Sequence, residues 1–465
     1  MIATTLQEVA EITAGSLINT ARPDAVVTGE LSIDSRTTGS GGLFVARAGE
    51  YADGHDHVGD ALAAGAVAAV VDHDVGHPAV LVADTELALA QIARSVVDRV
   101  SGLVTVALTG SSGKTTTKDL LAEVLAARGP LVAPPGSYNT DTGVPLTVAH
   151  VGPDTATLVV EMGARGAGHI TRLTRIAPPD VAVVLNVGSA HLGEFGGAEQ
   201  IAAAKSELVA ALHPDGVAVL NADDTAVQAM AGRAPGGVVR FGLSSTAEVR
   251  AERVTLDERA RASFRLVTPG GSSWVRLGLV GKHQVSNALA AAAVAHVLDQ
   301  EVGDVAAALA AARPRSQWRM EVSERGDGLV VINDSYNSNP ESARAALDAL
   351  VAMAGSRRSW AVLGEMAELG ETSGAAHEAL GALAVHQGVD RVLAIGEAAR
   401  PVYAAAHGDF GPDQTDQMSH WVPDIDAATL LLEEELTAGD VVLIKASRAV
   451  GLEHLVERVL QRGAP

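Results

Sequence analysis

The chain has 465 residues, with 34 Lys and Arg against 56 Asp and Glu, a formal net charge of −22 at pH 7. This acidity argues against a general nucleic-acid binder, because a phosphate backbone needs a basic face. With no cysteine, disulfides, thiol nucleophiles and Cys-ligated metals are excluded. No apolar run reaches the ~20 residues of a membrane span. The amphipathic start, with Glu8 and Glu11, is unlike a secretory signal. We expect a cytoplasmic protein without a membrane span.

The pattern of apolar runs predicts an α/β chain with three domains. Residues 1–85 mix short strands, at 43–45 and 69–71, with an alanine-rich helix over 58–64. Residues 100–312 alternate apolar strands with helices, which is typical of a parallel sheet. The strands expected there are 103–108, 157–160, 181–185 and 217–220. A strand-rich insert at about 247–278 and a long helix at about 283–298 follow.

A second strand–helix alternation predicts a Rossmann-like C-terminal domain over residues 313–465. Its expected strands are 329–332, 359–363, 391–395 and 441–444. The boundary is placed near Pro314, because proline interrupts the preceding helical pattern. The predicted fold is therefore a central P-loop parallel-sheet domain flanked by a small N-terminal α/β domain and this C-terminal one.

Residues 107–118, Ala-Leu-Thr-Gly-Ser-Ser-Gly-Lys-Thr-Thr-Thr-Lys, follow a strand and open a helix. Backbone N–H groups and the helix dipole in such a turn bind phosphate, the lysine adds charge, and the last threonine can bind Mg²⁺. The motif is shortened, because Leu108 stands where the usual first glycine would be. An ordinary strand–turn–helix corner is the alternative. The expected nucleotide-binding residues are Thr109, Gly110, Ser111, Ser112, Gly113, Lys114 and Thr115.

Polar residues recur where the predicted central strands end, and ligands bind at the carboxyl ends of parallel strands. Each could instead be a loop residue or a helix cap. Together with the phosphate loop they indicate an Mg²⁺–nucleotide site, since Mg²⁺ needs few carboxylates beside phosphate and water oxygens. They are Glu161, Asn186, Gly188, His191, Asn221, Asp223 and Asp224. Lys205 lies on a predicted amphipathic helix, where its pattern alone favours a solvated surface lysine.

These residues resemble the Mur ligase family, whose members join an amino acid or peptide to a UDP-muramoyl substrate using ATP. The Lys114-Thr115 loop, Glu161-Met-Gly, the Asn186–His191 loop and Lys205-Ser-Glu occur in the family's order. Three further strings narrow the resemblance to members that add D-alanyl-D-alanine to a UDP-N-acetylmuramoyl tripeptide. They are Asp34-Ser35-Arg36, the run from Asn333 to Pro340, and Leu363-Gly-Glu-Met-Ala-Glu-Leu-Gly.

The resemblance implies roles for individual residues. ATP would contact Lys114 and Asn139, with Asn287 at the adenine and Arg319 and Asp334 reaching over from the C-terminal domain. Two Mg²⁺ ions would be held by Thr115, Glu161, His191 and a carbamylated Lys205, so that Lys114, Lys205 and His191 form the expected catalytic set. Substrate would contact Ser35 and Arg36 near the uridine diphosphate, together with Thr140, Tyr336 and Asn337.

Some strings depart from the family's usual form. Asn333-Asp334 replaces Asp-Asp, His283-Gln284 replaces His-Asn, and Lys445-Ala446-Ser447-Arg448 replaces Lys-Gly-Ser-Arg. The roles of Lys445 and Arg448 are left open.

The expected activity is an ATP-dependent carboxylate–amine ligation through an acyl phosphate, in peptidoglycan precursor synthesis, by a monomer. Three alternatives remain at this stage. Two lie in the same superfamily, a diamino-acid-adding ligase and a folate polyglutamate ligase. The third is a P-loop nucleotide switch that hydrolyses ATP without a second substrate.

Overall fold

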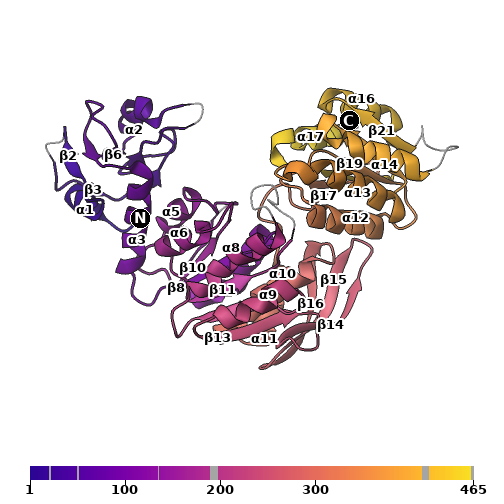
Figure 1. Ribbon diagram of the computed structural model, residues 1–465, viewed down its shortest axis with the longest axis horizontal. Coiled ribbons are helices and arrows are strands. Elements are labelled where there is room, and N and C mark those ends of the chain that lie inside the picture. The colour runs from indigo at the N-terminus through magenta and orange to yellow at the C-terminus, as the bar shows by residue number, and fades with distance from the viewer. Residues whose placement is uncertain (20–21, 50–51, 135, 189–196, 411–417, 462–465) are drawn as a thin grey trace.

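The chain, seen in a computed structural model, is described over residues 1–19, 22–49, 52–134, 136–188, 197–410 and 418–461. It forms three α/β units, each built on its own main sheet. The N-terminal and C-terminal units stand on opposite sides above the central one (Figure 1). The predicted fold class is confirmed. No helix in the described part of the chain is both long and apolar enough to cross a bilayer.

The N-terminal unit has a five-stranded sheet in the order β2-β7-β6-β5-β4, in which only β2 runs antiparallel to its neighbour. A separate pair, β1 (Thr4–Thr5) and β3 (Val26–Val27), lies beside it. The main strands are β2 (Ser16–Ile18), β4 (Leu31–Ser32), β5 (Leu43–Val45), β6 (Ala68–Val71) and β7 (Ala79–Leu81). The helices are α1 (Leu6–Ile12), the 3₁₀ turn η1 (Gly54–His57) and α2 (Val58–Ala63).

Helix α3 (Thr85–Arg99) joins the N-terminal and central units. Asp84 caps its start by accepting hydrogen bonds from two backbone N–H groups. Leu89 and Ile92 pack in the N-terminal core, whereas Ala93 and Val96 pack in the central core. One continuous helix therefore ties the two units together.

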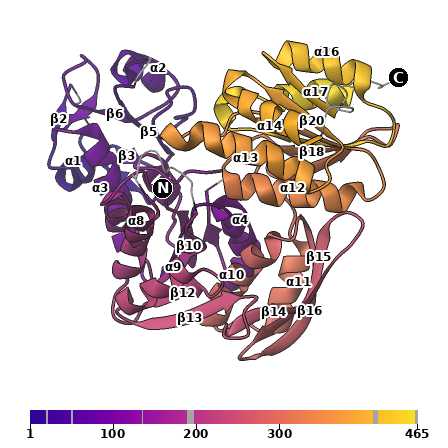
Figure 2. The same cartoon turned by 45° about the vertical axis from the view of Figure 1, so that its right-hand side comes forward.

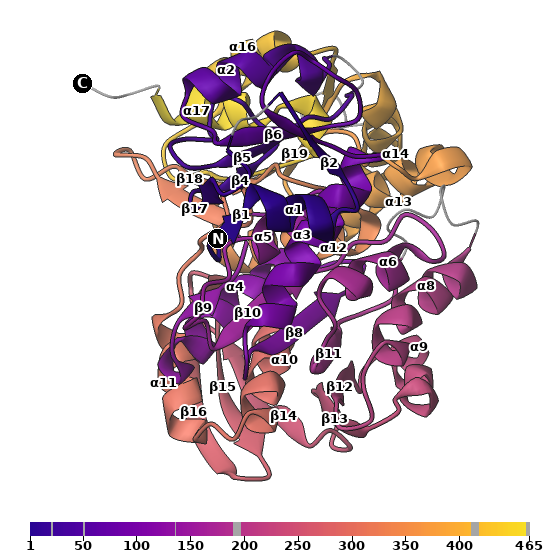
Figure 3. The same cartoon turned by 90° about the vertical axis from the view of Figure 1, so that its left-hand side faces the viewer.

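The central sheet has nine strands in the order β16-β15-β14-β13-β12-β11-β8-β10-β9. Its parallel strands are β8 (Val104–Thr109), β9 (Leu131–Val132), β10 (Thr157–Glu161), β11 (Val181–Val184), β12 (Val217–Asn221) and β13 (Gly237–Gly242). Alternate residues face opposite layers, so Val106 and Leu108 join the core with α4, α10 and α11 while Ala107 faces α3, α5, α6 and α8. Figure 3 shows these two helix layers on either side of the sheet.

The helices of this unit are α4 (Lys114–Val124), α5 (Gly143–Val148), α6 (His169–Ile176), α8 (Ala198–Ala210), α9 (Thr225–Gln228), α10 (Gln284–Val297) and α11 (Val302–Ala311), with the turns η2 (Leu125–Arg128) and η3 (Ala229–Arg233). The strand-rich insert does not form a layer of its own. Strands β14 (Val249–Leu256), β15 (Arg261–Thr268) and β16 (Gly271–Val280) continue the same sheet. Strand β14 runs parallel to β13, and β15 runs antiparallel to both β14 and β16.

The C-terminal unit has a six-stranded sheet in the order β17-β18-β22-β19-β20-β21, parallel except for the edge strand β17. Its strands are β17 (Glu321–Glu324), β18 (Val330–Asp334), β19 (Ser359–Leu363), β20 (Arg391–Ile395), β21 (Ser419–Val422) and β22 (Val441–Lys445). Helices α12 (Pro340–Ala354), α13 (Ser373–His386) and α14 (Arg400–Phe410) cover one face. Helices α16 (Ile425–Glu435) and α17 (Glu453–Gln461) cover the other. The short turns are η4 (Gly370–Thr372), η5 (Glu397–Ala399) and η6 (Arg448–Val450).

Candidate active site

A cavity of about 520 Å³ lies between the central and C-terminal units. Residues at the carboxyl ends of β10, β18 and β22 line it, together with the first residues of α4, α10 and α12. The C-terminal unit carrying α12 lies over the part of the central unit that carries α4 (Figure 2). Strand ends and helix N-termini from two sheets thus face one space, which is where ligands bind in parallel α/β folds.

The loop between β8 and α4 has the shape of a phosphate-binding turn. Gly113 adopts a left-handed φ of +79° immediately before the helix begins at Lys114. Lys114 Nζ donates to the Gly110 carbonyl oxygen at 2.7 Å. Asn186 Oδ1 accepts from the backbone N–H groups of Ser111 and Ser112, both at 2.9 Å. Asn186, which follows the neighbouring strand β11, therefore fixes the loop through these two hydrogen bonds.

We expect Gly113→Ala to destabilise the phosphate loop. The left-handed φ costs a residue with a Cβ about 1–2 kcal/mol, and a Cβ there would lie 2.5 Å from Asn287 Oδ1. Thermal unfolding should show a lower midpoint for this variant. Gly232→Ala is the matched control, because its Cβ would meet nothing within 4 Å and its φ is not positive. Equal midpoints for the two variants would contradict the strain argument.

A buried cluster of oxygen-bearing side chains surrounds Glu161 at the end of β10. Glu161 is fully buried. It accepts from Thr115 Oγ1 at 2.9 Å, Ser137 Oγ at 3.0 Å and Asn139 Nδ2 at 2.6 Å. The cluster joins the start of α4 to the loop before α5. It presents a carboxylate, two hydroxyls and an amide oxygen, which are the donor types that Mg²⁺ prefers.

Two lysines of the central unit, Lys114 and Lys205, have lowered pKa values. Burial lowers the pKa of Lys114, and the charge of Arg319 adds to this while Glu161 and Glu368 oppose it. Burial lowers the pKa of Lys205 to about 7, with the positive charge of Lys114 as the second cause. Lys205 is only 3% exposed in α8, so the surface-lysine interpretation of its sequence pattern is wrong.

The C-terminal wall of the cavity is held by an ion pair between two strands. Lys445 Nζ donates to Asp334 Oδ2 at 2.5 Å and to the Asn337 carbonyl oxygen at 2.8 Å. The Arg319 guanidinium stacks over the Tyr336 ring, 4.1 Å from its centroid. Facing them from the central unit, His283 has its pKa lowered to about 4 by burial, so its ring is neutral near pH 7.

Most of the residues predicted for the site line this one cavity. They are Ser111, Ser112, Gly113, Lys114, Thr115, Asn139, Thr140, Glu161, Asn287, Arg319, Asp334, Tyr336 and Asn337. Thr109 and Gly110 do not line it, because Thr109 is fully buried and Gly110 packs against Leu185. Lys205 is buried and is not among the lining residues. His191 lies outside the described residues.

Ser35 and Arg36 are in the N-terminal unit and do not line the cavity. The Arg36 side chain is 86% exposed, and its guanidinium donates bidentate hydrogen bonds to the Asp34 carboxylate. Hydrogen bonds from the Arg36 side chain and then from its backbone lower the pKa of Asp34 to about 2.

Three of the polar residues predicted at strand ends have structural roles instead. Asp224 caps α9 and accepts from Val187 N at 2.8 Å. Asp223 accepts from two backbone N–H groups after β13, and Asn221 donates to the Leu185 carbonyl oxygen. None of them lines the cavity, so their inclusion in an Mg²⁺ site is wrong. Carboxylates at strand ends satisfy loop N–H groups as readily as they bind ions.

Several lining residues were not predicted. This set comprises Ser137, Arg165, His169, Glu341 and Glu368. Lys445 and Arg448 also line the cavity, and the sequence predicts no role for either. Position along the chain was an available signal for Arg165 and His169, since Arg165 lies in the loop after Glu161 and His169 begins α6 at the end of that loop. His169 Nε2 pairs with Asp141 at 2.8 Å. The Arg448 guanidinium stacks on Trp318, 3.9 Å from its ring centroid.

A phosphate loop on a parallel sheet, facing a cavity that a second α/β unit closes, defines an ATP-dependent ligase of the P-loop class. Family models match three segments: the "Mur ligase family, catalytic domain" over residues 29–102, the "Mur ligase middle domain" over 108–295, and the "Mur ligase, glutamate ligase domain" over 318–448. The chain belongs to the Mur ligase family.

Several similar proteins carry one name. The UDP-N-acetylmuramoyl-tripeptide–D-alanyl-D-alanine ligase of Mycobacterium tuberculosis is 47% identical, over 97% of this chain and 96% of its own. The ligase of the same name from Escherichia coli is 34% identical over the whole of both chains. A crystal structure of MurF from Acinetobacter baumannii matches with a TM-score of 0.89 at 31% identity, over 99% of both chains. MurF from Thermotoga maritima, solved in complex with ADP, matches with a TM-score of 0.78 at 30% identity, over 94% of this chain and 98% of its own.

Proposed function

We propose that this chain joins D-alanyl-D-alanine to a UDP-N-acetylmuramoyl tripeptide, with ATP converted to ADP and phosphate. The main support for this proposal is that one cavity is lined by the phosphate loop, by the Glu161 cluster and by residues of the C-terminal unit. Two relatives named for this reaction, 47% and 34% identical, match over nearly the whole of this chain. In this proposal ATP phosphorylates the tripeptide carboxylate, and the amine of the dipeptide then attacks the acyl phosphate.

The nucleotide would bind along the phosphate loop. The N–H groups at the start of α4 and the Lys114 ammonium face the cavity, where they would neutralise the β- and γ-phosphates. Asn287 lies against Gly113, on the side proposed for the adenine. Arg319 and Asp334 would contact the nucleotide from the C-terminal unit. Lys445, which donates to Asp334, would hold that carboxylate in place.

The Glu161 cluster fits a bound Mg²⁺, because its oxygen donors are buried and converge on one carboxylate. Thr115 and Glu161 would hold one ion, and a carbamate on Lys205 together with His191 would hold a second. When bound, Mg²⁺ neutralises phosphate charge. This chain's own contribution is to fix Glu161 through Thr115, Ser137 and Asn139, and to keep Lys205 uncharged enough to react with CO₂.

Bond formation itself needs no protein nucleophile. Lys114 would stabilise charge on the transferring phosphoryl group, and the two units would hold carboxylate, phosphate and amine together. A closed cavity also keeps water from the acyl phosphate. The amine, which must be neutral to attack, loses a proton as the amide forms and phosphate leaves.

We propose that each of the three predicted domains binds a different part of the substrates. Residues 1–85 would bind the uridine diphosphate through Ser35 and Arg36, and the exposed Arg36 guanidinium suits a diphosphate. Residues 100–312 would bind ATP. Residues 313–465 would bring Tyr336 and Asn337, with Thr140 of the central unit, to the peptide.

We expect phosphate release to require both the UDP-N-acetylmuramoyl tripeptide and D-alanyl-D-alanine. The physical reason is that the phosphoryl acceptor is the tripeptide carboxylate and the amine removes the acyl group. A coupled phosphate assay, run with each substrate omitted in turn, measures this. Free diaminopimelate with the dipeptide nucleotide, and glutamate with a folate, are the controls for the two related ligases. Equal ATP turnover with and without the substrates would instead indicate a nucleotide switch.

A further inference from the structure

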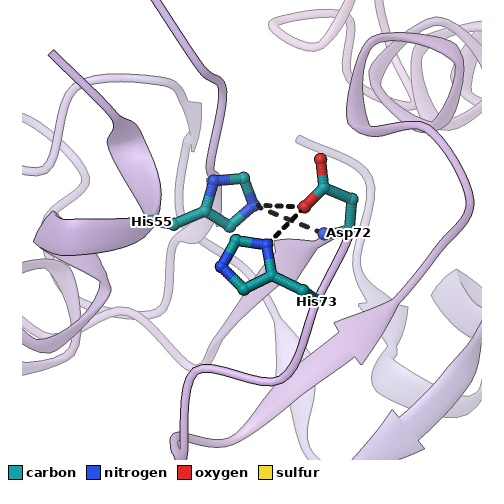
Figure 4. A group of neighbouring side chains, drawn as sticks. All are labelled: His55, Asp72 and His73. Carbon is teal, nitrogen blue, oxygen red and sulfur yellow. Dashed lines mark hydrogen bonds and ion pairs between the residues drawn. The ribbon is translucent and has the colours of Figure 1, made fainter.

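A group of histidine and aspartate side chains lies in the N-terminal unit, apart from the cavity described above. His55 belongs to η1, while Asp72 and His73 follow β6 directly. His55 is buried, whereas the side chains of Asp72 and His73 are 44% and 59% exposed. Figure 4 shows the two imidazole rings converging on the Asp72 carboxylate. The proposed ligase reaction uses none of the three.

The three side chains offer ligand atoms to a common point. His55 Nε2 lies 3.2 Å from Asp72 Oδ1, and His73 Nδ1 lies 2.6 Å from the same oxygen. One ligand atom from each residue falls within 4.8 Å of the other two. Ligands bound at about 2.0–2.2 Å around a tetrahedral ion have similar separations. Because His73 and Asp72 are half-exposed, both can adjust while His55 stays fixed.

His55 is oriented by a fourth residue. Its Nδ1 lies 2.7 Å from Asp53 Oδ1, and Asp53 also accepts from His55 N at 3.0 Å. A carboxylate on the far ring nitrogen fixes the tautomer of a metal-binding histidine and leaves Nε2 as the free electron pair. Here Nε2 faces Asp72.

The surroundings of His55 suit a bound cation. Both of its ring nitrogens face carboxylate oxygens, but a neutral imidazole has only one N–H. One ring nitrogen therefore carries a free electron pair, and an ion between Nε2 and Asp72 would meet that pair and a carboxylate oxygen together. The competing arrangement without a cation is a long hydrogen bond, at 3.3 Å, from the Asp72 backbone N–H to His55 Nε2.

We propose that His55, Asp72 and His73 bind a divalent transition-metal ion, with Zn²⁺ as the preferred ion and water completing its coordination. Two imidazole nitrogens and one carboxylate oxygen suit Zn²⁺, whereas Mg²⁺ and Ca²⁺ take oxygen ligands. The ion would connect η1 to the end of β6 and so stabilise the N-terminal unit.

The test is a Zn²⁺ titration of the full-length, metal-stripped chain without nucleotide, followed by calorimetry and by thermal unfolding. We expect about one equivalent bound at this site and a rise in the unfolding midpoint. His73→Ala and His73→Gln should weaken Zn²⁺ binding more than about 100-fold, beyond the roughly 10–100-fold that loss of an outer partner alone costs. His57→Ala is the matched control, because the half-exposed His57 pairs with Asp60 instead.

Two further measurements separate a metal site from a hydrogen-bonded cluster. Asp53→Asn should weaken Zn²⁺ binding about 10–100-fold, as expected for the orienting carboxylate. Co²⁺ should give the intense visible absorption of a tetrahedral site in the wild type and in His57→Ala, and lose it in His73→Ala. Unchanged Zn²⁺ affinity in both His73 variants, or no binding to the wild type, would overturn the proposal whatever the outcome for ligase activity.

Discussion

Replacing Lys114 with methionine should lower kcat/KM for ATP about 10²–10³-fold, the cost of removing one preorganised charge from the transition state of a transfer reaction. Lys114 Nζ is held at 2.7 Å from the Gly110 carbonyl oxygen, at the start of α4. Methionine keeps most of the volume and removes the charge. The loop should stay folded, because Asn186 still accepts from Ser111 and Ser112. Phosphate release against ATP concentration measures the loss.

Lys282→Met is the control for removing a lysine near the site. Lys282 is exposed and precedes α10, but it does not line the cavity. Its activity should stay within about twofold of the wild type, because exposed substitutions away from special features have small effects. If Lys114→Met retained the same activity as Lys282→Met, the phosphate loop would not be the site of ATP turnover.

Local signals explain why so many strands were predicted from the sequence. Strands β5, β19 and β20 have the predicted bounds, since each is a short apolar run ended by turn residues. The start of α4 was predicted from Gly113 and Lys114, which sit next to each other in the chain. These signals lie within a few neighbouring residues, so they can be read without knowing which other elements pack against the strand or helix.

Non-local pairing explains most of what was missed. The sequence predicts a strand-rich insert but not its partner strand, and β14 pairs with β13 through Phe241 and Val249 and extends the central sheet. The pairing of Lys445 with Asp334 joins strands 111 residues apart. No sequence spacing indicates which carboxylate a distant lysine will meet. Most residues carried over from the family resemblance line the cavity, although Ser35, Arg36 and Lys205 do not, because the fold and its strand order are shared.

The burial of Lys205 also depends on non-local packing that the sequence pattern does not indicate. A lysine on an amphipathic helix is ordinarily solvated, and the helical pattern of α8 gives no sign that this position is buried. Burial follows from the packing of α8 against the central sheet, where Ala204 and Leu208 join the core. This burial, which the helical pattern does not indicate, lowers the pKa of Lys205 to about 7.

Lys205→Ala should lower ligase activity at least about 100-fold while leaving the fold intact, because a carbamate on Lys205 would supply an anionic oxygen ligand beside the phosphates. Ordinary exposed lysines have a pKa near ~10.4. Burial, aided by the charge of Lys114, lowers the pKa of Lys205 to about 7, so the amine is largely neutral above that pH and can react with CO₂. Phosphate release and circular dichroism measure activity and folding, with Lys282→Ala as the matched control.

The sign of the pH dependence follows from that lowered pKa. Protonation below about pH 7 removes the nucleophilic amine, so the carbamylated fraction should fall as the pH drops and rise again as it is raised. Carbon-13 NMR with labelled bicarbonate should show a carbamate signal in the wild type that is absent from Lys205→Ala. A short carboxylate such as acetate should restore part of the activity of Lys205→Ala, since it can occupy the space left by the longer side chain. Full activity in Lys205→Ala, or a wild type without the carbamate signal at pH 8, would show that Lys205 acts only by packing in the core.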